Sequence, residues 1–240
     1  MRWIIGGTSG IGAAIADIFD SYDQKAPLVS DAKDCDVRGY DNIVRALSNA
    51  VYEAKMEESP LKTIVYSAGV NDLMHLGSMR QSGTLDAGDV IDVNMIGFIR
   101  LMDAVMDPEV FPEEWRKNLT VIAISSDAAV RPMRTSMAYC ASKAGLNMAV
   151  KVAARECGTH GTRVLGLAPG MTEGTRMTDY IDSTVPILRG WTTEETLRYE
   201  ALQEVVPGRV QLEELAVTAL MMANGPRHWT GDIVTVNGGR

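Results

Sequence analysis

Short runs of β-branched and other apolar residues alternate along the chain with longer stretches that have helical periodicity. This alternation is typical of β-α-β units and predicts an α/β fold with a mostly parallel sheet. We expect strands at Trp3–Ile5, Leu28–Ser30, Thr63–Ser67, Thr120–Ser125, Val164–Ala168 and Ile233–Val236. We expect helices at Ile11–Tyr22, Asp41–Glu58, Asp89–Met106, Tyr139–Thr159 and Glu213–Met222.

The apolar spacing also indicates how the chain is organised. In the second helix, one stripe is formed by Ile43, Val44, Leu47, Ala50, Val51 and Ala54, as a helix lying on a sheet requires. No proline- or glycine-rich linker divides the chain, so residues 1–240 are expected to form one domain. The least regular segment, residues 171–206, is predicted to be a substrate loop or lid.

Composition and charge narrow the function classes. Hydrophobic residues make up 46% of the chain and charged residues 22%, which are ordinary globular values. The net charge of -8 disfavours a nucleic-acid partner, because such a partner requires a basic face. Three scattered cysteines and three distant histidines favour neither a disulfide framework nor a metal site. With no apolar stretch long enough for a membrane span, we expect a soluble cytoplasmic protein.

A glycine-rich loop follows the first predicted strand directly. It reads Gly6-Gly7-Thr8-Ser9-Gly10-Ile11-Gly12 and leads into a helical run. Glycines allow the backbone to approach a pyrophosphate, and the following helix offers free N–H groups and the positive end of its dipole. The loop therefore predicts a nucleotide site, although a strand-to-helix turn without any ligand has the same local pattern.

The Gly-x-x-x-Gly-x-Gly spacing resembles the short-chain dehydrogenase/reductase family, with Ile5 where that family usually has threonine. The resemblance continues in order along the chain and is closest to the 3-oxoacyl-[acyl-carrier-protein] reductases, notably in the terminal Val-Asn-Gly-Gly. The motifs that carry it are Asp36-Val37, Ser67-Ala68-Gly69, Asn94-Met95-Ile96-Gly97, Ser125-Ser126, Tyr139-Cys140-Ala141-Ser142-Lys143, Pro169-Gly170, Pro207-Gly208-Arg209 and Val236-Asn237-Gly238-Gly239.

This resemblance implies a Rossmann-type doubly wound parallel sheet and a nicotinamide coenzyme. The implied coenzyme-binding residues are Gly6, Thr8, Ser9, Gly10, Ile11, Gly12, Asp31, Asp36, Val37, Ser67, Ala68, Gly69, Tyr139, Lys143, Pro169, Gly170 and Thr172. Thr175 is a further, insecure candidate in the same loop. Asp36 follows Asp31 by only five positions, whereas the family usually fits a helix and a strand in this part of the chain. We therefore expect a fold shortened after the second strand and a more open adenosine side.

Tyr139 and Lys143 lie four residues apart at the start of a helix, so their side chains project from one face. An ammonium ~4 Å from a phenol favours the phenolate by about 4 kcal/mol at an effective dielectric of ~20, which would lower the tyrosine pKa. Such a tuned group suits general acid–base catalysis. The same spacing also occurs in ordinary surface pairs of helices.

Ser126 precedes Tyr139 by thirteen residues, at the carboxyl end of a predicted strand. By the resemblance, Ser126 would bind the substrate oxygen, Tyr139 would transfer the proton, and Lys143 would hold the ribose and lower the tyrosine pKa. Ser125 is the competing serine. Asn94 would bind a water linked to Lys143, or would only make a structural bond to a neighbouring backbone group.

We therefore predict an oxidoreductase that moves a hydride between nicotinamide and a carbonyl compound or secondary alcohol. The alternatives are a catalytically silent nucleotide sensor or scaffold, and epimerisation or dehydration by the same tyrosine and lysine. Asp31 favours NAD over NADP, although Ser30 competes for the ribose contact and Lys33 lies near enough to neutralise a phosphate. Residues 171–206 suggest a partly apolar wall without an anion site. The resemblance implies a homotetramer or dimer, and apolar Met95, Ile99, Met102, Met148 and Val152 fit such contacts.

Overall fold

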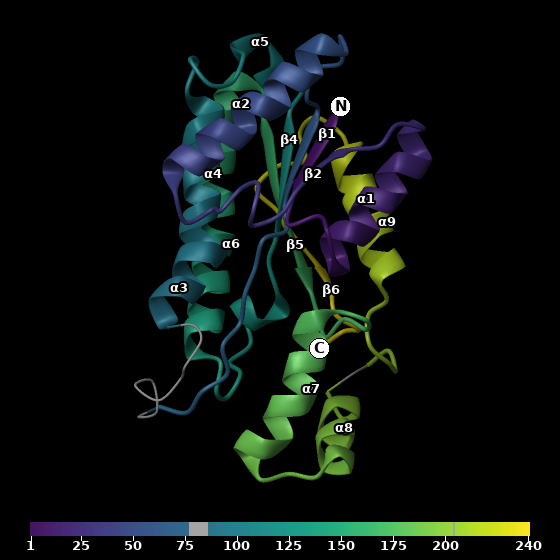
Figure 1. The fold of residues 1–240 in the computed structure, drawn as a ribbon. Helices are drawn as coiled ribbons and strands as arrows, with labels where there is room; N and C mark the ends of the chain where they lie inside the picture. Colours follow the sequence, from purple (N-terminus) through teal and green to yellow (C-terminus); the bar gives the residue numbers. More distant parts are fainter. Residues whose placement is uncertain (77–85, 204) are drawn as a thin grey trace.

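The computed structural model describes residues 1–76, 86–203 and 205–240, and six parallel strands form its central sheet (Figure 1). The strands are β1 (Arg2–Ile5), β2 (Leu28–Ser30), β3 (Thr63–Tyr66), β4 (Thr120–Ile124), β5 (Arg163–Pro169) and β6 (Ile233–Val236). Their order across the sheet is β2-β1-β3-β4-β5-β6. The order reverses beside β1, which is the arrangement of a doubly wound fold, and the predicted fold class is confirmed.

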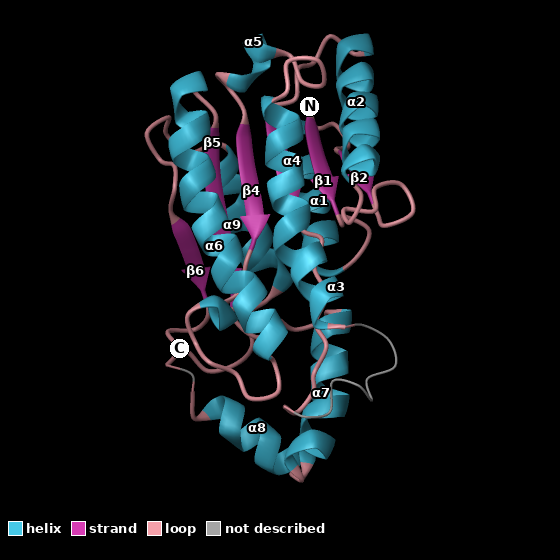
Figure 2. Cartoon of the chain, turned by 90° about the vertical axis from the view of Figure 1, so that its left-hand side faces the viewer, coloured by secondary structure: helices cyan, strands magenta, loops and turns pink. Residues whose placement is uncertain are grey.

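Helices cover both faces of this sheet (Figures 1 and 2). One face carries α2 (Tyr40–Met56), α4 (Gly97–Met106) and α6 (Met137–Cys157), and the other carries α1 (Gly10–Asp23) and α9 (Leu212–Ala223). The four central strands β1, β3, β4 and β5 are therefore buried on both faces, which explains why they are rich in apolar residues, whereas the edge strands β2 and β6 are partly exposed. The short helix α5 (Glu113–Arg116) precedes β4.

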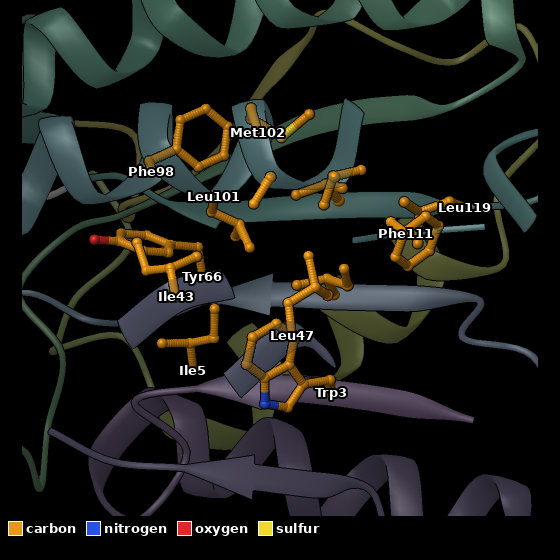
Figure 3. Close-up of a cluster of buried hydrophobic side chains, with 14 of the residues drawn as sticks. Trp3, Ile5, Ile43, Leu47, Tyr66, Phe98, Leu101, Met102, Phe111 and Leu119 are labelled. Carbon is orange, nitrogen blue, oxygen red and sulfur yellow. The ribbon is translucent and has the colours of Figure 1, made fainter. Parts of the chain in front are cut away.

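The larger hydrophobic core lies between the sheet and the helices α2, α4 and α6 (Figure 3). Trp3 and Ile5 of β1 point into it, whereas Ile4 between them belongs to the core on the opposite face, as the two-residue period of a strand requires. The predicted stripe of α2 is confirmed, because Ile43 and Leu47 are fully buried against these strands.

The shortening after the second strand is also confirmed. Residues 31–39 lead from β2 to α2 without another helix or strand, so β2 is the outer strand of the sheet. A compact turn closes this link, in which the Cys35 N–H donates to the Asp31 carbonyl oxygen at 2.8 Å.

One predicted helix is interrupted. The segment Asp89–Met106 contains α3 (Ala87–Ile91), a π-helical stretch (Asp92–Ile96) and α4. The π-helical stretch contains the fully buried Asn94 and inserts an irregular turn between the two α-helices. Apolar periodicity alone does not distinguish such a π-helical insertion from a continuous helix, and these insertions are frequent at functional sites.

The segment 171–206 is more regular than its sequence suggested. It contains α7 (Arg176–Arg189) and α8 (Thr193–Ala201), which form a helical hairpin beyond the carboxyl ends of the strands (Figure 1). Glu204 lies outside the described residues. Arg209 anchors the hairpin by bonding to Asp182 of α7 at 2.7 Å and Glu200 of α8 at 2.9 Å. The apolar residues of α7, Met177, Ile181 and Val185, line the cleft.

The apolar residues expected at subunit contacts differ in how exposed they are. Met102 is buried in the core, so it is not part of any surface patch. Ile99, Met148 and Val152 are 44%, 59% and 45% exposed on α4 and α6. These three residues fit the expected contact between chains, and the homotetramer stays a prediction.

Leu47 tests the larger core. Replacing Leu47 with alanine should lower the free energy of unfolding by about 2–5 kcal/mol, because the fully buried side chain would leave a cavity under α2. Tyr52→Ala on the same helix is the control, since Tyr52 is 61% exposed and its loss should change stability by no more than about 0.5 kcal/mol. Urea denaturation followed by circular dichroism measures both, and equal losses would contradict the assigned packing.

Candidate active site

A cleft of about 970 Å³ lies at the carboxyl ends of β1, β3, β4 and β5, between the sheet and the α7–α8 hairpin. It is where an open parallel sheet binds its ligands. Asn94 and Gly12 are the two predicted site residues that do not line it. The predicted residues that do are Gly6, Thr8, Ser9, Gly10, Ile11, Asp31, Asp36, Val37, Ser67, Ala68, Gly69, Ser126, Tyr139, Lys143, Pro169, Gly170 and Thr172.

The glycine loop makes two close backbone approaches. Gly6 has a φ of 80°, and a Cβ atom there would lie 2.8 Å from the backbone nitrogen of Ala68. A Cβ on Gly12 would collide with the Gly6 carbonyl oxygen, so Gly12 supports the turn from beneath rather than facing the cleft. The Ser9 side chain makes no capping bond at the start of α1. The first N–H groups of this helix therefore remain available to a ligand.

Charged groups of both signs line the adenosine end of the cleft. Asp31 and Lys33 face it, and the Asp31 carboxylate accepts a bond from the Lys33 N–H at 2.8 Å. Asp36 pairs with Arg38 at 2.9 Å, and this hydrogen bond lowers the pKa of Asp36. The Ser30 hydroxyl accepts from the Trp3 indole at 3.0 Å, and Ser30 is not among the lining residues. Asp31 is therefore better placed than Ser30 to meet a ribose.

Ser126 and Tyr139 meet at the carboxyl end of β4. Both are 8% exposed, and the Ser126 hydroxyl interacts with the Tyr139 phenol. Burial raises the pKa of this phenol, and the interaction with Ser126 offsets only part of that rise. Ser125 instead donates its hydroxyl to Asn147 at 2.6 Å, away from the tyrosine. The structure therefore favours Ser126 over Ser125 as the partner of Tyr139.

Lys143 lies deep in the cleft, 3% exposed, and its ammonium donates to the Ile124 carbonyl oxygen at 2.8 Å. Burial lowers the pKa of Lys143 to about 8. Its nitrogen is 5.7 Å from the centre of the Tyr139 ring, so the expected shared helix face is confirmed. The expected effect on the tyrosine is wrong for the protein alone, because burial raises the pKa of Tyr139 to about 12.

The buried Asn94 side chain holds the backbone of Val70, which lines the cleft. Its amide oxygen accepts from the Val70 N–H and its amide nitrogen donates to the Val70 carbonyl, both at 2.8 Å. The amide nitrogen also donates to the Ser142 hydroxyl at 3.0 Å. The expected structural bond to a neighbouring backbone group is confirmed for this side chain, while the water link to Lys143 stays a prediction.

The loop after β5 closes one side of the cleft. Thr172 donates its hydroxyl to the Gly170 carbonyl at 3.0 Å, which folds the loop back on itself. Thr175 also lines the cleft, but its hydroxyl accepts from the Thr178 N–H at 3.0 Å and caps α7. Arg176 of α7 donates to the Ser9 hydroxyl at 2.7 Å, so this loop contacts the glycine loop.

Several arginines in the cleft were missed by sequence reasoning, which found no anion site in residues 171–206. Arg131, Arg134 and Arg189 all line the cleft. Arg189 is more than fifty residues from the other two in sequence, and no motif links them. Only the folded structure shows that they share one cleft.

Other site types find no support among the described residues. In the described ranges 1–76, 86–203 and 205–240, no cluster of three or more histidine, cysteine, aspartate or glutamate side chains could hold a metal ion. Within the same part of the chain, no helix is both long and apolar enough to span a membrane.

Comparison with known proteins places this site in context. Residues 30–186 match the model of the short chain dehydrogenase family. A similar relative is the 3-oxoacyl-[acyl-carrier-protein] reductase FabG of Chlamydia muridarum, 26% identical over 98% of this chain and 95% of its own. The short-chain reductase protein NovJ of Streptomyces niveus is 28% identical over 86% of this chain and 72% of its own.

Solved structures share the fold. A short chain dehydrogenase family protein from Francisella tularensis superposes with a TM-score of 0.79 at 17% identity, covering 99% of this chain and 97% of its own. A single-substitution variant of actinorhodin polyketide ketoreductase, solved with NADPH, gives a TM-score of 0.81 at 21% identity, covering 99% of this chain and 95% of its own.

The buried ammonium of Lys143 should cost stability. The pKa of Lys143 falls from 10.5 to about 8 on folding. Below pH 8 the side chain is charged in both states, and burying that charge destabilises the folded state. This destabilisation disappears as the pH rises from 8 to 10.5. Lys143→Met should therefore raise the free energy of unfolding at pH 7 by about 1–3 kcal/mol, a gain that shrinks toward pH 10.

Urea denaturation at pH 7 and pH 10 measures this difference. Lys151→Met is the control on the same helix, because Lys151 is exposed and its replacement should give no pH-dependent gain. A Lys143 variant less stable than the wild type at both pH values would show that the bond to Ile124 outweighs the cost of burying the charge.

Proposed function

The chain belongs to the short-chain dehydrogenase family and is an oxidoreductase of that family, and from this premise we propose that it transfers a hydride between a nicotinamide coenzyme and a carbonyl compound or secondary alcohol. One observation carries the proposal. Ser126, Tyr139 and Lys143 are buried together at the end of β4, in the same cleft as the glycine loop.

The residues of the cleft fit a dinucleotide. The tight turn at Gly6 lets the backbone approach a pyrophosphate, and the uncapped start of α1 supplies N–H donors for it. Ser67, Ala68 and Gly69 line the wall beside this turn, and Pro169, Gly170 and Thr172 line the opposite side. A bound nicotinamide would supply or accept the hydride, and the side chains around it would handle the proton.

Tyr139 is the proposed proton donor and acceptor. With a pKa near 12 the phenol keeps its proton at neutral pH, so it is ready to donate to the oxygen of a carbonyl substrate. Ser126, which interacts with the phenol, would hold that oxygen by a second hydrogen bond. The Lys143 ammonium lies beside the phenol ring and would stabilise the phenolate after the proton has left.

Two alternatives fit the site less well. A nucleotide sensor or scaffold does not need a buried ammonium beside a buried phenol, and both groups lose hydration in the folded chain. Such costly groups are typically retained at sites that carry out chemistry. Epimerisation or dehydration would use the same pair, and the reductase names among the relatives favour hydride transfer for this chain.

Tyr139→Phe removes the proton donor and leaves the cleft otherwise intact. We expect turnover of a ketone screen to fall roughly 100- to 10,000-fold, because general acid catalysis contributes about that much. Coenzyme binding, measured by fluorescence titration, should change little. A variant that kept more than about a tenth of wild-type turnover would contradict the role of Tyr139.

The adjacent serines provide a matched control for this assignment. Ser126→Ala should lower turnover strongly, since its hydroxyl interacts with the phenol, whereas Ser125→Ala removes only the bond to Asn147. Comparable losses in the two variants would mean that turnover reports on the stability of this loop rather than on Ser126.

We further propose a preference for NAD over NADP. Asp31 lines the adenosine end, where a carboxylate accepts bonds from ribose hydroxyls and repels a 2′-phosphate. Lys33 lines the same end and partly offsets that repulsion, while Arg38 is already paired with Asp36. The balance favours NAD, because Asp31 needs no rearrangement to meet a ribose.

Separate fluorescence titrations with NADH and NADPH measure this preference. The wild type should bind NADH more tightly than NADPH. Asp31→Ala should narrow this difference, because it weakens NADH binding and removes the repulsion between the carboxylate and the 2′-phosphate of NADPH. That repulsion costs roughly 1–4 kcal/mol. Asp41→Ala is the control, because Asp41 is exposed in the first turn of α2 and is not part of the cleft lining. Tighter NADPH binding by the wild type would overturn the preference.

A further inference from the structure

We infer that the hairpin end of the cleft binds an anionic group of the substrate, with Arg189 as its principal ligand. The inference rests on the proposed function, because it concerns the molecule whose carbonyl or hydroxyl would meet Tyr139. It adds a substrate class to that function: an oxo compound with a carboxylate or phosphate at a distance from the reacting carbon.

Arg189 is held in place before any ligand binds. It is the last residue of α7, and Gly190, with a φ of 64°, turns the chain back so that Trp191 reaches its guanidinium. That guanidinium lies 4.8 Å from the Trp191 ring centre and 5.4 Å from the Tyr199 ring centre. Two aromatic contacts from the hairpin therefore fix this cation at the cleft.

The Trp191 and Tyr199 ring centres are 5.2 Å apart, so both rings lie to one side of the guanidinium. This arrangement leaves N–H donors of the guanidinium to which a carboxylate or phosphate can bind. The Arg189 guanidinium makes no hydrogen bond or ion pair with any other residue that the structure describes. Its Nε is buried without a partner, which is costly for a charged group. An oxyanion in the cleft would satisfy these donors.

The charge balance of this end of the cleft supports the same conclusion. Arg131 lines the cleft and bonds to Gln203, just after α8, at 3.0 Å, and two carboxylates that line the cleft are already engaged. Asp127 pairs with Arg131 at 3.4 Å, and Glu200 pairs with Arg209 at 2.9 Å. With these carboxylates paired, the Arg189 guanidinium is left to attract an anion, and a cleft focuses the potential of such a charge on an incoming ligand.

The wall between Tyr139 and Arg189 is largely apolar. Met177, Ile181 and Val185 follow one another along α7 toward Arg189, at the spacing of one helix face, and all three line the cleft. This arrangement suits an aliphatic chain that joins a reacting carbonyl to a terminal anion. Short ketones and neutral ketones would leave the Arg189 donors without a partner.

The test compares an oxo acid with its neutral ester. We would measure kcat/KM of the wild type for 7-oxooctanoate and for methyl 7-oxooctanoate, using the preferred coenzyme. The acid should be favoured roughly 10- to 100-fold, which corresponds to one hydrogen-bonded charge pair. Arg189→Met should abolish this preference mainly through KM and leave ester turnover within about twofold.

Two further variants separate charge from structure. Arg189→Lys keeps the charge but loses the paired edge donors, so it should retain only part of the preference. Arg198→Met removes an exposed arginine of α8 that does not line the cleft, and it should behave as the wild type. Thermal unfolding of all variants checks that the hairpin has not come apart.

Octanoate binding, measured by calorimetry on the coenzyme-bound protein, gives a readout that needs no turnover. Arg189-dependent binding together with acid-selective turnover would support the inference. The inference of an anion site would be overturned if the wild type turned over ester and acid with equal kcat/KM, or if Arg189→Met lowered both values equally. Either result would leave the proposed function standing. If no carbonyl compound were turned over, the proposed function would fail, and octanoate binding lost in Arg189→Met would still support the anion site.

Discussion

The sheet is buried on both faces, and the placement of the polar groups of this protein depends on that constraint. Helices cover each side of the sheet, so the four central strands have no face on which polar side chains can meet water. Polar and glycine residues are instead found where the strands end. Because parallel strands end at the same edge, Gly6, Gly69 and Ser126 come together from distant parts of the chain.

Much of this arrangement could be predicted from the sequence, and the parts that failed share a physical cause. The six strands and the stripe of α2 follow from the burial of strands and helices against one sheet, and that burial leaves a periodic pattern. The α7–α8 hairpin was predicted only as a loop or lid, because it is held by Arg209 and by the contact between Trp191 and Tyr199 rather than by burial against the sheet. The arginines of the cleft were missed because no sequence motif links them.

The pair Tyr139 and Lys143 shows a second limit of sequence reasoning. Four-residue spacing correctly places Lys143 beside Tyr139, but spacing does not reveal how deeply either group is buried. Burial has the larger effect. It raises the pKa of the phenol and lowers that of the ammonium, so both equilibria shift toward the neutral form, while Lys143 with a pKa of about 8 still carries its charge at neutral pH. The charge of Lys143 considered alone predicts the opposite direction, a lower pKa for Tyr139.

The short link between β2 and α2 has a consequence for association between chains. Without a further strand beyond it, β2 presents an open row of backbone donors and acceptors at the rim of the sheet. An open rim of this kind is a template on which another chain can pair and begin to aggregate. Here the rim is only three residues long and lies between Pro27 and Asp31. Pro27 has no N–H to donate, and the charge of Asp31 resists desolvation. The chain thereby protects itself against fibril-like growth without needing a covering strand.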